Sequence, residues 1–277
     1  MGSGLNTVSF GAQRITIEDV VRIALHDTQV ELSNAPSFTQ KVDAGVSFLD
    51  QLLKEEGHIY GVTTGYGDSC TVEVPLSLVD ELPMHLTRFH GCGLGEFFSP
   101  EEGRAILATR LVSLSQGDSG VSWDLLNLLV DMLNKHIIPV IPQEGSVGAS
   151  GDLTPLSYVA GALIGERDVY YQGKVMASSE AFKQASLKPI KLRPKEGLAI
   201  MNGTAVMTAL ACKAYDRAEY LTKLMARITA LSSLALKGNS NHFDDILFSV
   251  KPHPGQNEIA AWIQHDLNHH SHPRNSQ

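Results

Sequence analysis

The sequence contains little cysteine, and its cysteines lie far apart. Cys70, Cys92 and Cys212 are the only ones among 277 residues, and no two of them form a Cys-x-x-Cys pair. An odd number of widely spaced cysteines supports neither a disulfide framework nor a zinc site. The sequence therefore favours a reducing compartment, and we expect a cytoplasmic protein.

The chain also lacks a basic cluster and a long apolar run. Its formal net charge is -8 at pH 7 and its pI is near 5.7, so it has no electrostatic footprint for phosphate backbones. No apolar run approaches the roughly 20 residues of a membrane-spanning helix, and the N-terminus lacks the basic and apolar regions of a signal peptide. We therefore expect neither nucleic acid nor a membrane as a partner.

Two glycine-rich segments lack the spacing of nucleotide-binding loops. Residues 91–95, "GCGLG", have no G-x-G-x-x-G spacing, and residues 60–67, "YGVTTGYG", have no Gly-Lys-Ser/Thr. Four histidines near the C-terminus could ligate a metal, but no cysteine or carboxylate cluster completes a ligand shell: His265, His269, His270 and His272. We expect no metal and no nucleotide cofactor.

The pattern that is present is mostly helical. Residues 17–27 place apolar side chains on one helical face, after a short β-like lead. Residues 204–237 contain no Pro or Gly, Thr204 can cap their start, and Gly238 stands where a C-terminal glycine belongs. Such a helix would run roughly 50 Å and needs a bundle partner along its length. We predict a mainly α protein with a small mixed N-terminal region, divided into an N-terminal domain, 1–203, and the start of a long-helix bundle, 204–277.

The segment 145–158, "GSVGASGDLTPLSY", places small residues before a helix start. Thr154 and Pro155 fit the N-cap and first helical residue, so the positive end of the helix faces Ala149, Ser150 and Gly151. Small residues in a tight turn can bring a backbone nitrogen against the carbonyl two residues earlier. Attack by the Gly151 nitrogen on the Ala149 carbonyl, with loss of the Ser150 hydroxyl as water, would give a ring with an exocyclic methylidene. Such a group is a strong electrophile.

This segment resembles the cofactor-forming segment of the histidine, phenylalanine and tyrosine ammonia-lyases and the related aminomutases. That family builds 4-methylidene-imidazol-5-one from Ala-Ser-Gly. Two further motifs agree: "YGVTTGYG" resembles the family's catalytic tyrosine loop, and "KEGLAIMNGT" resembles the segment whose Asn contacts the prosthetic group. The motifs occur in family order, and the resemblance covers the whole chain. It implies the long-helix bundle fold of the histidine and phenylalanine ammonia-lyases, with the electrophile formed autocatalytically from Ala149-Ser150-Gly151.

The resemblance also implies a role for each matching residue. Tyr60 matches the tyrosine that removes the β-proton of the amino acid, a task that needs a phenolate. Asn202 would hold the prosthetic group and the substrate amine by hydrogen bonds, and Asp152 would assist ring closure. The implied reaction eliminates ammonia from an L-aromatic amino acid and leaves an α,β-unsaturated acid.

Phe89 and His90 occupy the positions where family members contact the substrate ring. Phenylalanine lyases resemble Phe-Leu there, tyrosine lyases His-Leu and histidine lyases Ser-His. Phe89 favours a carbocycle by packing, whereas His90 could bind a phenol or an imidazole, or could be an ordinary core histidine. We expect tyrosine or phenylalanine as the substrate; the alternatives are a histidine ammonia-lyase giving urocanate and an aromatic 2,3-aminomutase.

The family usually runs to about twice this length, and its second half supplies a second catalytic tyrosine and an arginine that binds the substrate carboxylate. We therefore expect that a C-terminal half, from the same gene or a separate chain, completes the site. The resemblance also implies a homotetramer with residues 204–237 in an intersubunit bundle. A truncated, non-catalytic lyase-like subunit is the alternative from a different functional class.

Overall fold

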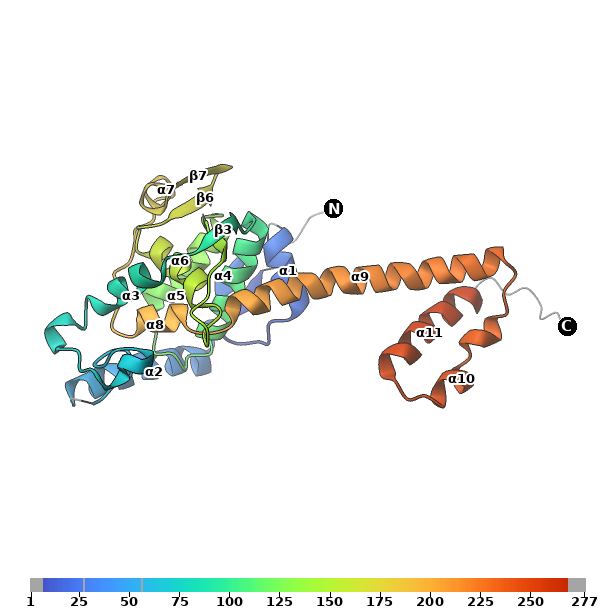
Figure 1. Cartoon of the computed structure of the whole chain (residues 1–277), viewed down its shortest axis with the longest axis horizontal. Helices are drawn as coiled ribbons and strands as arrows, with labels where there is room; N and C mark the ends of the chain where they lie inside the picture. The colour runs from blue at the N-terminus through green and yellow to red at the C-terminus, as the bar shows by residue number, and fades with distance from the viewer. Residues whose placement is uncertain (1–6, 27, 56, 269–277) are drawn as a thin grey trace. The chain divides into compact units, whose positions relative to one another are not determined.

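The computed structural model describes residues 7–26, 28–55 and 57–268 (Figure 1). The chain divides into two compact units, unit 1 (Met1–Lys213) and unit 2 (Ala214–Gln277). This division falls inside a long helix, whereas the predicted boundary between 203 and 204 lies at the start of that helix. The domain boundary stays a prediction.

The described residues are mainly helical, which confirms the predicted fold class. The helices that begin in unit 1 are α1 (Ile17–Leu25), α2 (Pro36–Lys54), α3 (Leu82–His90), α4 (Pro100–Leu114), α5 (Trp123–Asn134), α6 (Leu153–Leu163), α7 (Ser178–Gln184), α8 (Glu196–Met201) and α9 (Ala205–Ala235), with the short 3₁₀ turns η1 (Gly67–Thr71) and η2 (Leu76–Leu78). Unit 2 contains the rest of α9, then η3 (Ser240–Phe243), α10 (Asp245–Ser249) and α11 (Pro254–Asn268).

The strands are short and form three small sheets in unit 1. A parallel pair joins β1 (Val8–Phe10) to β2 (Val30–Leu32), and an antiparallel pair joins β3 (Leu94–Phe97) to β5 (Pro142–Glu144). The third sheet is antiparallel, in the order β4 (Ile138–Pro139), β6 (Asp168–Tyr171) and β7 (Lys174–Ala177). The first pair is the mixed N-terminal region that the sequence predicted.

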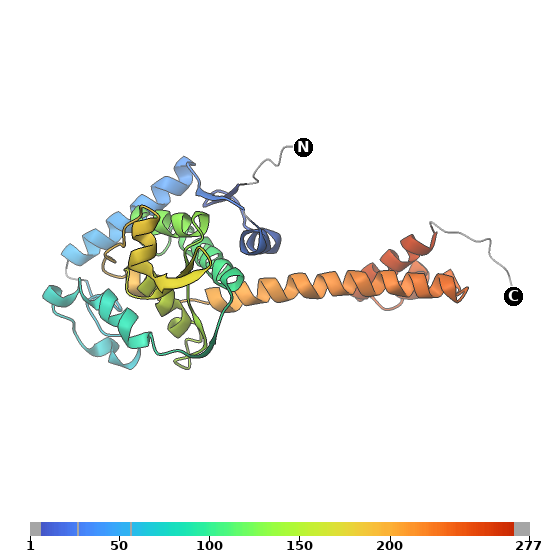
Figure 2. The ribbon, with the colours of Figure 1, turned by 90° about the horizontal axis from the view of Figure 1, so that it is seen from above.

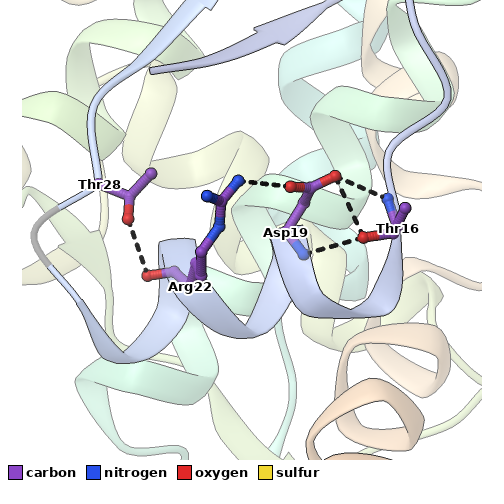
Figure 3. A network of polar contacts seen from close by, with 4 residues as sticks. All are labelled: Thr16, Asp19, Arg22 and Thr28. Carbon is purple, nitrogen blue, oxygen red and sulfur yellow. Dashed lines mark hydrogen bonds and ion pairs between the residues drawn. The ribbon is translucent and has the colours of Figure 1, made fainter. Parts of the chain in front are cut away.

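Helix α1 begins with a complete capping box. The Thr16 hydroxyl accepts from the Asp19 N–H at 3.2 Å, and the Asp19 carboxylate accepts from the Thr16 N–H at 3.0 Å (Figure 3). Asp19 also pairs with Arg22 one turn later, at 2.6 Å. The capping box satisfies the N–H groups of Thr16 and Asp19, which have no partner within the helix. The predicted apolar face of this helix is buried: Val20, Val21, Ile23 and Ala24.

The core of unit 1 is built around α4. This helix packs against α1, α5 and α8, and its residues from Gly103 to Leu111 are all buried. Ser99 caps it through a second capping box with Glu102. A helix that is buried all round must be covered by neighbours on every side, and one of the neighbours of α4 is α8, which leads to Asn202.

The long predicted helix is confirmed as α9, drawn as one continuous rod in Figure 2. Its end differs in detail from the prediction. Lys237, at φ 55°, takes the left-handed position expected for Gly238, and its N–H donates to the Leu234 carbonyl at 3.1 Å. The Gly238 N–H donates to the Ser233 carbonyl at 2.7 Å, so Gly238 stands one residue beyond the left-handed residue of a Schellman motif.

By length and composition, one helical stretch of the described residues, Glu196–Ala235, could cross a membrane; an 18-residue window of it has a mean hydropathy of 1.2. The stretch is interrupted, because α8 ends at Met201 and α9 begins at Ala205. A core helix passes the same test, so the finding is weak. The expected absence of a membrane partner stays a prediction.

Unit 2 has its own small core between α9 and α11. The buried residues are Ala226, Ala230, Ile263 and Leu267. An ion pair between Arg227 and Asp266, at 2.6 Å, joins the same two helices. Within the described residues no group of His, Cys, Asp or Glu is arranged to hold a metal ion. His269, His270 and His272 lie outside the described residues.

Candidate active site

Three helices of unit 1 pack against one another and carry three of the motifs found in the sequence. Helices α3, α6 and α8 make mutual contacts. Phe89 and His90 end α3, Ala149-Ser150-Gly151 precede α6, and Asn202 follows α8. The three motifs therefore lie at the ends of helices that pack on one another.

The prosthetic-group loop, residues 145–152, is exposed apart from Ser150 and Asp152, which are half-buried. Gly148 takes a left-handed conformation, with φ 80°, and the Ser150 carbonyl accepts from the Val147 N–H at 3.3 Å. The Gly151 nitrogen and the Ala149 carbonyl make no hydrogen bond to any described residue. The two groups that ring closure must join are therefore not engaged elsewhere.

Helix α6 begins earlier than the sequence predicted. Its N-cap is Asp152 and its first residue is Leu153, so the assignment of Thr154 as N-cap was wrong. The Asp152 carboxylate does not cap its own helix: Oδ2 accepts from the backbone N–H groups of Val206, at 2.8 Å, and Met207, at 3.1 Å. The hydroxyl of Thr154 is buried without a partner.

Pro155 is tolerated inside this first turn for a simple reason. The first four N–H groups of a helix have no partner within the helix, so a residue without an N–H loses nothing there. The carboxylate of Asp152 accepts hydrogen bonds from N–H groups at the start of α9, which likewise have no partner within their own helix. This contact places the prosthetic-group loop beside the segment that carries Asn202.

The tyrosine loop, residues 60–67, presents Tyr60 to solvent. Tyr60 is 49% exposed, and its hydroxyl oxygen accepts from the Gly67 N–H at 2.8 Å. Its ring meets the ring of Tyr66 edge to face, with centroids 6.3 Å apart. Burial, and secondarily the charge of Tyr60, raises the pKa of Tyr66. Tyr60 is therefore the more accessible of the two phenols.

Gly61 brings the tyrosine loop onto α8. Its φ is 69°, and a Cβ there would lie 2.5 Å from Tyr66 Cε1 and 2.9 Å from Leu198 Cδ2. Leu198 belongs to α8, and its carbonyl accepts from the Asn202 N–H at 2.8 Å. The loop thus packs one helical turn from Asn202, whose side chain is exposed.

The end of α3 holds two rings in contact. Phe89 is 78% exposed and His90 is half-buried, and their rings lie edge to face with centroids 5.0 Å apart. Burial lowers the pKa of His90 below its usual value, so the imidazole is neutral at pH 7. Arg88, on the same turn, is paired with Glu166 through a 2.9 Å hydrogen bond that anchors the helix end.

The chain that follows His90 runs beside the prosthetic-group loop. Strands β3 and β5 pair Leu94 with Glu144, and a Cβ on Gly145 would lie 3.4 Å from the Cα of Gly93. The Gly93 N–H donates to the hydroxyl of Tyr158, on α6, at 3.1 Å. These contacts bring the end of α3 and the start of α6 together.

Gly91, the first glycine of "GCGLG", stands where packing leaves no room for a side chain. A Cβ on Gly91 would overlap the guanidinium of Arg167, which donates to the Gly91 carbonyl at 3.1 Å and stacks over the Tyr158 ring at 4.6 Å. Nothing in the sequence predicted that Arg167 and Tyr158 contact this segment. Arg167 stands in no motif, and the backbone partners of the two residues, Gly91 and Gly93, are more than sixty residues away in the chain.

A buried arginine completes the region and was also missed. Arg110, on α4, is 3% exposed, donates through Nη2 to the Ala199 carbonyl of α8, and has no partner for Nε. A Cβ on Gly203 would overlap its Nη1. Burial lowers the pKa of Arg110 to about 10, and the negative charge of Asp152 acts in the opposite direction. Because this pKa is well above 7, the side chain stays charged at pH 7.

Comparison with known proteins agrees with these motifs. The chain is 35% identical over 267 residues to histidine ammonia-lyase from Homo sapiens and 38% identical over 256 residues to that of Treponema denticola. The matches cover 96% and 92% of this chain but 40% and 50% of those relatives, so the chain spans about half their length or less. The solved structure of a tyrosine aminomutase from Streptomyces globisporus superposes with a TM-score of 0.87 at 35% identity, covering 94% of this chain and 48% of that one.

The described fold agrees with that of the solved aminomutase structure, and the sequence motifs lie at the ends of packed helices. The aromatic amino acid lyase family matches this sequence over residues 15–277. A match of that extent leaves almost no part of the chain outside the family, and we conclude that the chain belongs to the aromatic amino acid lyases.

Proposed function

We propose that the chain is the N-terminal half of an ammonia-lyase that acts on an L-aromatic amino acid, with L-histidine as the first candidate. The main support is that several similar curated relatives, from animals and bacteria, are histidine ammonia-lyases. They favour the histidine alternative over the expected preference for tyrosine or phenylalanine. The product from L-histidine would be urocanate.

The ring-contact positions are compatible with this proposal. His90 matches the histidine of the Ser-His pair that histidine lyases resemble, whereas Phe89 departs from that pair. A neutral imidazole has one donor and one acceptor nitrogen, so His90 can pair with a substrate imidazole in either tautomer. Phe89 supplies an apolar surface beside it.

The residues of the prosthetic-group loop fit formation of 4-methylidene-imidazol-5-one. A bond from the Gly151 nitrogen to the Ala149 carbonyl carbon releases the carbonyl oxygen as one water, and the Ser150 hydroxyl with its α-hydrogen leaves as a second. Both reacting backbone groups are free of hydrogen bonds to described residues, and Gly151 has no neighbour within 4 Å of where a Cβ would stand. The group supplies an electrophile that makes the amine of the substrate a better leaving group.

Two side chains of this half would then act on the substrate directly. Tyr60, as a phenolate, would accept the β-proton, and the Gly67 N–H that donates to its oxygen would stabilise that anion before the transfer. Asn202 presents an exposed amide, with a donor and an acceptor, to the substrate amine. The carboxylate of the substrate would be held by the C-terminal half.

We further propose that the active form is a homotetramer that includes this C-terminal half. Helix α9 supports the proposal, because large apolar side chains along it are exposed within unit 2. An aromatic 2,3-aminomutase is the second candidate, favoured by the likeness to the tyrosine aminomutase structure.

The proposal is tested on the chain assembled with its C-terminal half. Intact mass should show the loss of two water molecules. L-histidine, L-phenylalanine and L-tyrosine are then supplied separately, and we expect the highest kcat/KM for L-histidine, with urocanate as product. A mass without the loss of two waters would exclude the prosthetic group. Formation of a β-amino acid would identify an aminomutase. If an arylacrylate were formed faster than urocanate, L-phenylalanine or L-tyrosine would be the preferred substrate.

A further inference from the structure

Helix α4 carries two buried arginines that are used differently. Arg104 is 5% exposed and donates to the carbonyls of Ile23, at 2.7 Å, and Leu133, at 2.9 Å. These bonds tie α1 and α5 to α4, away from the prosthetic-group loop. Arg110 is 3% exposed, yet its Nε has no partner and its one backbone acceptor is the Ala199 carbonyl. A buried cation with an unpaired donor is costly unless a nearby charge compensates it.

The surroundings of Arg110 point to the candidate site. Ala199 lies in the last turn of α8, directly before Asn202, and Gly203 leaves the space that Nη1 occupies. Asp152 is the acidic residue whose charge acts on Arg110. The guanidinium therefore lies against the turn that carries Asn202, and the N–H groups of Val206 and Met207, which follow that turn, hold the Asp152 carboxylate.

We propose that Arg110 is a positioning residue for the prosthetic-group loop. Its bond to the Ala199 carbonyl fixes the turn at Gly203, and that turn leads directly into the first turn of α9. Asp152 in turn holds the first N–H groups of α9, at Val206 and Met207. The inference rests on the proposed function, because it concerns the geometry in which the loop closes its ring.

The physical reason is that ring closure depends on a forced approach of two backbone groups. The loop has little to hold it internally: the Ser146 hydroxyl accepts from the Gly148 N–H at 3.1 Å, and most of the other residues are small and exposed. Its fixed end is Asp152, whose carboxylate accepts from the N–H groups of Val206 and Met207 in the first turn of α9. Without the bond from Arg110 the turn at Gly203 is less constrained, and so are the N–H groups of α9 that hold the Asp152 carboxylate.

The test uses three variants of the chain assembled with its C-terminal half: Arg110→Met, Arg110→Lys and Arg104→Met. Arg104→Met is the matched control, because it removes a buried arginine from the same helix without touching the site. The measurements are the rate at which the mass falls by two waters after synthesis, amide hydrogen exchange at Val206 and Met207, and thermal unfolding.

We expect Arg110→Met to lose water roughly ten- to a hundred-fold more slowly than the unchanged protein, the scale of a misplacement of about 1 Å. Exchange at Val206 and Met207 should become faster. Arg110→Lys should restore part of both, because the ammonium group can still donate to the Ala199 carbonyl. Arg104→Met should lower the unfolding temperature but keep the normal rate of water loss.

Equal rates of water loss in all variants would overturn the proposal, as would an equal slowing in Arg104→Met, which would mean a general loss of stability. If Arg110→Met does not fold, the comparison of Arg110→Lys with Arg104→Met decides in the same way. If the unchanged protein never loses water, the proposed function fails. In that case unaltered exchange at Val206 and Met207 in Arg110→Met overturns the positioning role, and faster exchange supports it.

Discussion

At the scale of single residues, the proposed chemistry depends most on Ser150, because only its hydroxyl can leave to create the methylidene. The side chain is half-buried in the prosthetic-group loop and caps no helix there, since α6 has Asp152 as its N-cap. Ser150→Ala should therefore abolish the loss of two waters and all turnover while the helical content stays the same. Mass spectrometry and circular dichroism of the complete assembly check this, and full activity in the variant would remove the prosthetic group from the mechanism.

Tyr60 is the second residue with a direct chemical role. Tyr60→Phe removes the phenol and little volume, so the mass loss should persist while kcat falls by roughly 10²–10⁴, the usual contribution of a general base. Tyr66→Phe is the matched control in the same loop: that ring is half-buried, and burial raises the pKa of its phenol, which makes it a poor base at neutral pH. A rate that is unchanged in the first variant, or equally reduced in both, would exclude Tyr60 as the base.

His90 decides the substrate ring if the imidazole pairs with it. His90→Leu would leave a polar ring atom of the substrate buried and unpaired, at a cost of about 1–3 kcal/mol, whereas phenylalanine has no such atom. The ratio of kcat/KM for L-histidine to that for L-phenylalanine should fall roughly ten- to a hundred-fold.

The same ratio measured with L-tyrosine separates an imidazole substrate from a phenol. A fall confined to tyrosine would identify the phenol as the partner of His90. Equal losses for all three amino acids would show that His90 is a core histidine.

At the scale of secondary structure, Glu196 connects two helix starts. It is 1% exposed, and its carboxylate accepts from the N–H of Ser122, at 2.7 Å, and from the N–H of Arg193, at 2.7 Å. Ser122 is the N-cap of α5, and Glu196 is the first residue of α8. One buried carboxylate therefore sets the relation between the core helix α5 and the helix that carries Asn202.

Glu196→Ala should lower the free energy of unfolding by about 1–3 kcal/mol, because it leaves two backbone donors without an acceptor. Glu196→Gln keeps one acceptor oxygen and should lose less. Glu180→Ala, at an exposed position of α7, is the control and should have little effect. Denaturant unfolding of the three variants checks this prediction, and equal stabilities would show that Glu196 does not hold these helices.

At the scale of the whole molecule, α9 presents an apolar face that unit 2 leaves uncovered. At 100° per residue these side chains fall on one side of the helix: Leu221, Leu224, Met225, Ile228 and Leu231. The opposite side packs on α11 through Ala226 and Ala230. An exposed face of this kind is typical of a helix that associates with other copies.

Met225→Glu combined with Ile228→Glu should therefore weaken subunit association. Each apolar side chain buried in an interface contributes about 1.5–3 kcal/mol, so the dissociation constant should rise at least roughly a hundred-fold. Val175→Glu, at an exposed apolar position of β7, is the matched control. Sedimentation velocity of the complete assembly measures the result, and an unaltered tetramer would show that this face is not the interface.

The sequence alone determined the features that depend on neighbouring residues. Helical spacing predicted α1 and α9, and the small residues at 149–151, Tyr60 and Asn202 indicated the family. These signals are local: a helical face repeats within a few positions, and a turn of small residues needs no distant partner.

Only the tertiary structure decided what depends on contacts between distant residues. The start of α6 moved to Asp152, because that carboxylate finds its partners at Val206 and Met207, more than fifty positions later in the chain. The role of Arg110 was equally invisible, since Ala199 and Gly203 reach it only after α8 packs on α4. A buried polar side chain must form hydrogen bonds that compensate for its loss of water, and its partners are whichever groups the folded chain brings near it. Those partners often belong to other helices or strands, so they cannot be read from the neighbouring sequence.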